Sequence, residues 1–443
     1  MKRFPNFAAF AAQGTWYRHA TTISESTRFS VPAILDGRRP RPRVREDYAG
    51  HPRNLFTLLR GRYRMNVAEE ATTMCPVPLC PPQARTTVIQ RMRKGRVTRF
   101  RRGVARISSG RPQLTFIHTL LPHEPRQYLP DGRAYISTSK PDPLGGLASI
   151  PRRFLSEQLE QRNLLQLQFA DRLLGELVGR LKGEGIWDRS LVALASDHGE
   201  SFANRPGPAP QFRVGELTFR RAASERNLQD IAGIALFVKY PGQQHGRTDD
   251  RFVRHVDLLP TILHFARISR PAGLIGHRLD DTRYRGHRTI AVYKQDGRLL
   301  TMAASRWLRR LHASKRRELA LFGSGEKSIF DFGPAPQLRG TPVDRLELRP
   351  RTALRATVAN AGARTTASFL PAQVSGRIRG GRTSGHTLLF ALNGTVVATA
   401  PSFAPVNGYS FSAMLPPDAF HLGANRLEIF EWLGGLEARR IYG

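Results

Sequence analysis

Apolar residues follow two spacings along the chain, and each spacing predicts a different kind of element. From 154 to 181 the large apolar residues recur mostly at four-residue steps, which predicts one face of a helix that ends at Gly183-Glu184-Gly185. The positions on this face are Leu155, Leu159, Phe169, Leu173, Leu177 and Leu181. Short apolar runs at 114–121, 191–195 and 234–239 predict buried strands. A long helix followed by a buried strand is typical of a doubly wound, mostly parallel sheet.

The C-terminal part of the chain has a different pattern. Two apolar runs, 387–392 and 395–399, flank Asn393-Gly394, which is a strong signal for a hairpin turn. The apolar positions within 427–432 indicate a further strand. We therefore expect residues 345–443 to form a small β-sandwich-like domain, which either caps the rest of the protein or binds carbohydrate.

The run from Leu191 to Glu200 carries the most informative chemistry. Its apolar residues end abruptly at Asp197-His198-Gly199. A buried strand that ends in this way delivers two metal-ligand side chains to the carboxyl edge of a sheet, where the ligand sites of open α/β sheets lie. A strand end followed by a polar turn is the plain alternative, so the interpretation depends on the segments that accompany the run.

Four further segments accompany it in a fixed order. They are 14–38, 116–125, 235–242 and 256–263, and the last contains the sequence Asp-Leu-Leu-Pro-Thr. Together with Ser-Asp-His-Gly they resemble the sulfatase and alkaline-phosphatase-like superfamily, particularly its bacterial membrane-associated members. The resemblance implies an α/β fold with an alkaline-phosphatase-like doubly wound, mostly parallel sheet and a C-terminal β-rich domain. It also implies a metal-dependent hydrolase or transferase that acts on a sulfate or phosphate ester.

The resemblance sets the expected domain boundaries. We expect a sulfatase- and alkaline-phosphatase-like catalytic domain over residues 1–285, a connecting segment over 286–344 and the β-sandwich-like domain over 345–443. The family's first strand ends in an acidic metal ligand and should precede residues 3–7, where this chain has only Met1-Lys2. The catalytic domain is therefore expected to lack its first strand.

Thr27 aligns with the nucleophile of the family. Sulfatases carry there a Cys or Ser that becomes formylglycine, and threonine cannot undergo this conversion because its β-carbon carries a methyl group. The resemblance is therefore to the phosphoethanolamine and phosphoglycerol transferases, in which threonine ligates the metal and forms a covalent phospho-enzyme. Ser26 is a second candidate nucleophile, and a helix N-cap is the structural alternative for Thr27. The segment 28–31 departs from the Cys-x-Pro-Ser-Arg signature, so the anchoring arginine is absent.

The resemblance gives roles to four more residues. Asp197 and His198 are expected to bind one divalent metal ion together with Thr27, and its identity among Ca, Mn, Mg and Zn stays open. His123 resembles the histidine that contacts the transferred group or protonates the leaving oxygen, with His118 as a weaker alternative. Lys239 resembles the lysine that binds an ester oxygen as a point charge. A surface histidine and a solvated strand-end lysine are the plain structural alternatives.

Charge allows a second function. The formal net charge is +34, and arginine carries nearly all of it. Such a balance suits nucleic acid or anionic lipid, but no compact basic run interleaved with aromatic residues occurs, so we expect no nucleic-acid partner. The densest basic stretch, 91–111, suits a polyanionic envelope or headgroup surface. The alternative function is therefore a truncated or inactive family member that binds anionic cell-envelope polymers.

Cysteine usage and targeting bear on location. Cys75 and Cys80 form either a small disulfide loop outside the cytoplasm or two free thiols inside it, and two cysteines alone cannot make a structural zinc site. The sequence has neither a secretory signal nor a bilayer-spanning run of about 18 apolar residues. The resemblance implies a cell-membrane location with an extracytoplasmic domain, reached through an upstream segment, and a lipid headgroup or envelope glycan as the substrate.

Overall fold

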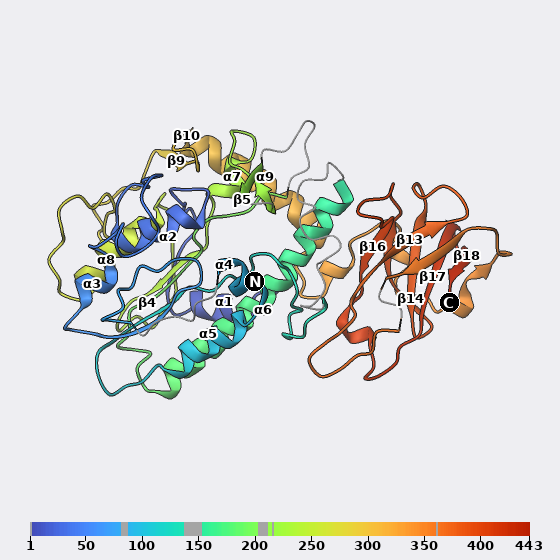
Figure 1. Ribbon diagram of the computed structural model, residues 1–443, viewed down its shortest axis with the longest axis horizontal. Helices are drawn as coiled ribbons and strands as arrows, with labels where there is room; N and C mark the ends of the chain where they lie inside the picture. The colour runs from blue at the N-terminus through green and yellow to red at the C-terminus, as the bar shows by residue number, and fades with distance from the viewer. Residues whose placement is uncertain (1, 81–86, 137–152, 203–210, 215–216, 360–361) are drawn as a thin grey trace. The chain divides into compact units, whose positions relative to one another are not determined.

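The computed structural model of the protein describes residues 2–80, 87–136, 153–202, 211–214, 217–359 and 362–443 (Figure 1). Contacts divide the chain into two compact units. The α/β unit comprises Pro5–Leu121 and Leu173–Arg316, and the β-rich unit comprises Met1–Phe4, Pro122–Arg172 and Arg317–Gly443. The division into three parts that the sequence predicted is not tested by these two units and stays a prediction.

Two sheets form the interior of the α/β unit. A mixed four-stranded sheet has the order β4-β7-β1-β8, and β2 and β3 form a separate parallel pair. In the mixed sheet β1 pairs parallel with β8, whereas β7 pairs antiparallel with both β1 and β4. The strands are β1 (Thr15–Tyr17), β2 (Arg64–Ala68), β3 (Gln113–Ile117), β4 (Val192–Ala195), β7 (Leu236–Lys239) and β8 (Arg247–Asp249).

The predicted α/β class is confirmed, and the predicted strands at 114–121, 191–195 and 234–239 correspond to β3, β4 and β7. Pairing within the larger sheet is mixed rather than mostly parallel. Parallel neighbours need a long crossover, usually a helix. Among the described residues between β4 and β7 the helical segment is only α7 (Leu228–Ala232), five residues long. Apolar runs mark strands without giving their direction, so the sequence pattern could not show this reversal.

Helices cover both faces of the two sheets. On one face, α2, α3 and α8 lie side by side (Figure 1) and pack against β3, where Phe56 meets Phe116 edge to face at 5.4 Å between ring centroids. On the other face, apolar residues of α1 and α6 pack against β4 and β7, and Gly103 of α5 lies against Ile117 of β3. The helices are α1 (Pro5–Ala11), α2 (Thr27–Asp36), α3 (Leu55–Leu59), α5 (Arg96–Ala105), α6 (Arg153–Gly183) and α8 (Leu258–Phe265). The predicted helix over 154–181 is thus confirmed as α6.

Among the described residues, β3 and β4 are both edge strands. In chain order α6 lies between β3 and β4, yet β3 and β4 belong to different sheets. Although helices pack against both strands, every residue of β3 is only partly buried and Ala193 of β4 is exposed. Apolar strands covered on both faces are normally fully buried. In the described part of the chain β3 pairs only with β2 and β4 only with β7, so each strand has one unpaired edge, which accounts for part of this exposure.

Smaller elements complete the α/β unit. The hairpin of β9 and β10 packs with α7 and the buried Trp307 of α9 in one apolar cluster. Cys75 and Cys80 form a disulfide. The remaining elements are α4 (Val88–Arg93), β5 (Gln211–Val214), β6 (Leu217–Arg221), β9 (Thr289–Tyr293), β10 (Leu299–Ala303), α9 (Ala304–Phe322) and the 3₁₀ helix η2 (His255–Asp257).

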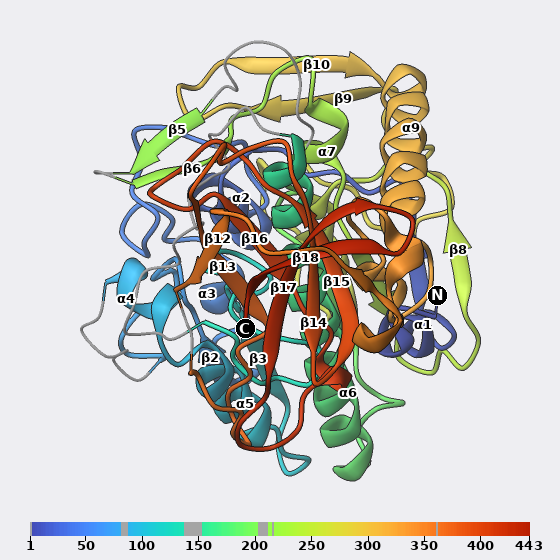
Figure 2. The ribbon, with the colours of Figure 1, turned by 90° about the vertical axis from the view of Figure 1, so that its right-hand side faces the viewer.

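The β-rich unit contains two sheets. One has the order β11-β18-β17-β14-β15, and the other has the order β12-β13-β16 (Figure 2). Its elements are η3 (Ser328–Phe330), η4 (Pro336–Leu338), η5 (Val343–Arg345), β11 (Glu347–Leu348), β12 (Arg355–Val358), β13 (Gln373–Arg379), β14 (Thr387–Leu392), β15 (Thr395–Pro401), β16 (Phe411–Met414), η6 (Pro417–Ala419), β17 (Leu427–Gly434) and β18 (Glu437–Tyr442).

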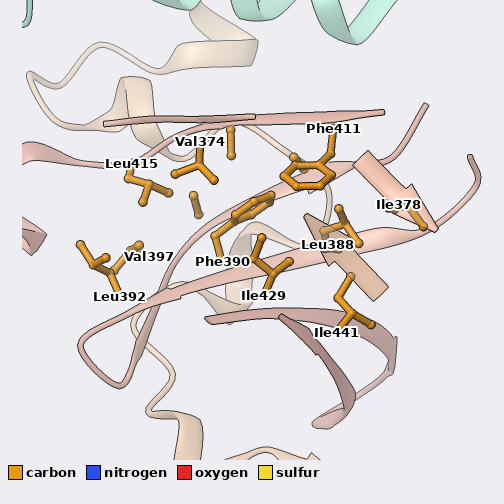
Figure 3. Packing of buried hydrophobic residues seen from close by; sticks show 14 of the residues in the cluster. Val374, Ile378, Leu388, Phe390, Leu392, Val397, Phe411, Leu415, Ile429 and Ile441 are labelled. Carbon is orange, nitrogen blue, oxygen red and sulfur yellow. The ribbon is translucent and has the colours of Figure 1, made fainter. Parts of the chain in front are cut away.

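Apolar side chains from both sheets meet in one core. Val374 of β13 and Phe411 of β16 face Phe390 of β14 and Ile429 of β17 (Figure 3). The rings of Phe390 and Phe411 are 5.8 Å apart between centroids. The predicted hairpin is confirmed: β14 and β15 pair antiparallel around Asn393 and Gly394, whose φ angles of 52° and 86° suit a type I′ turn.

Candidate active site

The first contact of the site joins a helix start to a strand end. Thr27 is the first residue of α2, and Ser26 before it is extended and makes no side-chain capping bond. The Oγ1 atom of Thr27 lies 3.1 Å from Nε2 of His198, which follows β4 and is 171 residues away in sequence. The sheet edge and the helix N-terminus therefore bring together two residues that the sequence analysis selected separately.

Hydrogen bonding assigns the tautomer of His198. Its Nδ1 lies 3.1 Å from the carbonyl oxygen of Gly199, and a carbonyl can only accept, so we assign the single proton of the neutral ring to Nδ1. The lone pair of Nε2 is then directed at the Thr27 hydroxyl, which donates to it. A hydroxyl beside the basic nitrogen of a histidine is the arrangement of an activated nucleophile.

Asp197 adds a carboxylate to this pair. Its Oδ1 accepts a hydrogen bond of 2.9 Å from the backbone N–H of His198, and its Oδ2 lies 3.4 Å from Nε2 of the same residue. The side chains of His198 and Asp197 are 11% and 22% exposed, so the group is mostly shielded from water and still accessible. Thr27, Asp197 and His198 therefore lie together, and their roles as nucleophile and metal ligands stay predictions.

Gly199 is required by a close approach of the backbone. Its N–H donates to the carbonyl of Ile231 at 2.8 Å. A Cβ at this position would lie 2.0 Å from the carbonyl oxygen of Asp230 and 2.7 Å from that of Gly233. The loop that carries Asp197 and His198 is therefore seated on the backbone around α7, and a side chain at Gly199 would lift it.

The sequence analysis missed His255 in η2. Its ring is fully buried, with Nε2 at 2.8 Å from the hydroxyl of Thr22. Burial lowers the pKa of His255 to about 3, and the charge of Asp197 opposes this shift. The neutral imidazole therefore joins the segment before Thr27 to the Asp197 loop. The only signal in the sequence was its position directly before the Val256–Leu263 segment.

Lys239 requires a correction, because the structure does not place it at this site. Its side chain is fully buried, and Nζ donates to the carbonyl oxygens of Trp187 and Asp188, each at 2.7 Å. Lys239 pairs with Val192, at the end of β4 farthest from Asp197. The reason is the antiparallel direction of β7. Burial lowers the pKa of Lys239.

The two histidines near β3 have different settings. His123 belongs to the β-rich unit, where Nδ1 lies 2.9 Å from the carbonyl oxygen of Glu124, and its catalytic role stays a prediction. His118 belongs to the α/β unit and follows β3 directly. Within the described part of the chain, Nδ1 of His118 and the hydroxyl of Thr119 are buried without a hydrogen-bond partner. Two polar atoms at the carboxyl end of β3 are therefore available for further hydrogen bonds.

The donor atoms of this site are of the types that bind divalent metal ions, but they are too few to hold one by themselves. Carboxylate, hydroxyl and imidazole suit such ions. However, no group of three His, Cys, Asp or Glu able to hold a metal occurs among the residues that the structure describes. Glu69 and Glu70, at the end of β2, are both engaged: Glu69 accepts from the backbone of Met74 and Cys75, and Glu70 pairs with Arg99 at 2.6 Å.

Comparisons with known proteins find one family model and several relatives that are similar to parts of this chain. The sulfatase family model matches residues 80–268. The chain is 24% identical over 152 residues to lipoteichoic acid synthase of Staphylococcus aureus (strain NCTC 8325 / PS 47), a match that covers 34% of this chain and 22% of that protein. The chain thus spans about a fifth of the length of this curated relative.

Solved structures are similar at low sequence identity. BT4656, in complex with its substrate D-glucosamine-2-N,6-O-disulfate, matches at 14% identity with a TM-score of 0.49, over 72% of this chain and 91% of that one. A phosphonate monoester hydrolase from Silicibacter pomeroyi matches at 13% identity with a TM-score of 0.47, over 72% and 90%. In the described portion of the chain, the helices fall short of the length and apolarity that crossing a bilayer requires. The sulfatase match and the similarity to lipoteichoic acid synthase support the resemblance of this chain to the sulfatase and alkaline-phosphatase-like superfamily, whose members are hydrolases or transferases of sulfate and phosphate esters.

Proposed function

We propose that this protein hydrolyses or transfers a sulfate or phosphate ester, with Thr27 as the nucleophile. The observation that carries the proposal is the 3.1 Å contact between Thr27 Oγ1 and His198 Nε2. Oγ1 attacks the phosphorus or sulfur atom and its proton passes to Nε2, while the bond to the leaving oxygen breaks. The N-terminus of α2 favours the negative charge that develops there. Water or an acceptor hydroxyl then takes the group from Thr27 and regenerates the hydroxyl.

We also propose that Thr27, Asp197 and His198 contribute three ligands to one divalent ion, either Ca, Mn, Mg or Zn. Such an ion neutralises charge on the transferred group and lowers the pKa of a bound hydroxyl. These three residues include only one carboxylate, so water or other groups would have to complete the coordination of the ion.

The test combines substitution with metal control. Purified protein should cleave an aryl phosphodiester or an aryl sulfate when a divalent metal is present, Thr27→Ala should abolish the activity, and Ser26→Ala should keep most of it. Removal of metal with a chelator separates the two roles of His198 Nε2, as proton acceptor or as metal ligand. Activity that persists in Thr27→Ala would remove Thr27 from the mechanism.

The proposal also covers the substrate and the location of the protein. The lipoteichoic acid synthase match supports a phosphodiester of the cell envelope, such as a lipid headgroup or a phosphate-containing envelope glycan, as the substrate. The Cys75–Cys80 disulfide supports an oxidising compartment outside the cytoplasm. We propose that the protein acts at the outer surface of the cell membrane.

A second candidate function has its own observation. Arg306, Arg309 and Arg316 lie at helical spacing on the exposed side of α9, and none of them makes a hydrogen bond or ion pair within the described residues. Such a stripe suits binding of an anionic envelope polymer without catalysis. Calorimetry separates the two functions: metal binding at micromolar affinity or tighter supports the enzyme. Salt-sensitive binding to polyphosphate without metal binding or turnover supports the inactive binding protein.

A further inference from the structure

A hollow of about 160 Å³ in the α/β unit is lined by two arginines. Arg39 follows the C-terminal end of α2, and Arg254 directly precedes η2. The larger apolar residues of its wall are Ile23, Ile275, Tyr293 and Leu299. The lining includes no Asp or Glu, so the hollow combines two positive charges with an apolar floor.

Arg254 forms no ion pair with a carboxylate among the described residues, although the nearby charge of Asp257 acts on it. Its Nε donates at 2.7 Å to Nε2 of His287, a ring whose pKa burial and the charge of Arg254 lower to about 3, so His287 is neutral. The nearby carboxylate of Asp257 is occupied, since it accepts from the backbone N–H groups of Arg254 and His277, each at 2.8 Å. A partly buried guanidinium that bonds only to a neutral ring retains donors for an anion.

Arg39 brings a second positive charge to the same place. Its side chain is exposed, and it makes neither a hydrogen bond nor an ion pair in the part of the chain that the structure describes. Its charge adds to burial in lowering the pKa of Arg254. Two like charges that face one hollow repel each other, and a bound anion would relieve this repulsion.

Size restricts the class of ligand. A volume of about 160 Å³ corresponds to roughly five water molecules at about 30 Å³ each. Pockets for larger organic ligands usually measure about 300–1,000 Å³. Arginine matches the paired oxygens of phosphate and sulfate groups. We propose that this hollow is a second oxyanion site, which binds a phosphate or sulfate group between Arg39 and Arg254.

The hollow is connected to the segment that carries the proposed nucleophile. Tyr293 donates its backbone N–H to the carbonyl of Ile23 at 2.8 Å and accepts from the N–H of Glu25 at 3.1 Å. Thr27 is four positions after Ile23 in sequence, which limits the distance between their Cα atoms to about 14 Å. A substrate with repeated anionic groups therefore reaches both places. This extension rests on the proposed function, whereas oxyanion binding in the hollow does not.

Calorimetry on the full chain tests the proposal directly. The probes are orthophosphate and dimethyl phosphate, which distinguish a free ion from an esterified group, at about 150 mM salt to screen diffuse attraction. Arg39→Gln should weaken binding about fivefold, and Arg254→Gln should weaken it about tenfold or more. Arg53→Gln is the matched control, because Arg53 is exposed, has no partner among the described residues and lies outside the hollow. Thermal unfolding shows whether Arg254→Gln is folded.

The outcomes are separable from those of the proposed function. Selective loss in Arg39→Gln, with Arg53→Gln and Thr27→Ala unchanged, supports the second site even if the protein proves inactive. Equal losses in Arg39→Gln and Arg53→Gln would show diffuse attraction to the basic surface and overturn the proposal. Loss in Thr27→Ala alone would place the anion at the candidate active site and overturn it as well, as would the absence of binding by either probe.

Discussion

The substitution Gly199→Ala tests whether the loop that carries Asp197 and His198 packs closely against the backbone of Asp230. The new Cβ would lie 2.0 Å from the carbonyl oxygen of Asp230, whereas ordinary contact begins at 3.4 Å, so the loop has to move by about 1.4 Å. Overpacking of this kind costs about 1–3 kcal/mol of unfolding free energy, which corresponds to a fall in Tm of about 3–9 °C. A displacement of about 1 Å at His198 should lower turnover about 100-fold.

Thermal unfolding and steady-state kinetics on the same preparations measure both effects. Gly179→Ala is the control, because Gly179 lies in α6 and its Cβ would meet nothing within 4 Å. That substitution should raise stability by about 0.5–1 kcal/mol and leave activity unchanged. If Gly199→Ala matched wild type in Tm and in turnover, the close approach of Gly199 to Asp230 would be refuted.

Three further predictions concern the disulfide, a buried histidine and the open strand edges. Cys80→Ser opens a loop of sequence separation 5, which should cost about 2 kcal/mol in denaturant unfolding; an unchanged midpoint under oxidising conditions would contradict the bond. The pKa of His287 is lowered to about 3 in the folded protein, against about 6.5 when unfolded. Because the unfolded state then binds more protons, the free energy of unfolding should fall as pH falls from about 6.5 towards 3, and His287→Gln should flatten this dependence; an equal slope in the variant would count against a neutral, buried ring. Hydrogen exchange should be fast at the free-edge amides of β4 and slow in β14, which is paired on both sides; strong protection throughout β4 would contradict the open edge.

Local patterns predicted much of the fold. The four-residue spacing of leucines gave α6, the Asn393-Gly394 turn gave the β14–β15 hairpin, and the apolar runs gave β3, β4 and β7. These features depend on neighbours in sequence. Periodicity and turn chemistry therefore sufficed to predict them.

Local sequence patterns could not predict the direction of strands or the contacts between residues far apart in the sequence. The antiparallel pairing of β7 turned Lys239 away from Asp197, and the apolar run that contains it reads the same in either direction. His255 was missed because its importance comes from contact with Thr22, 233 residues away in sequence. The meeting of Thr27 with His198 was anticipated only because family motifs preserve their order along the chain.

Trapping the reaction intermediate tests the central claim most directly. Protein mixed with an aryl phosphodiester and a divalent metal, then quenched within one turnover, would be digested and its peptides analysed by mass spectrometry. The account predicts a phosphoryl adduct on Thr27 that is absent from Thr27→Ala. Turnover with the adduct on Ser26, or with no adduct in the peptide that contains Thr27, would contradict it.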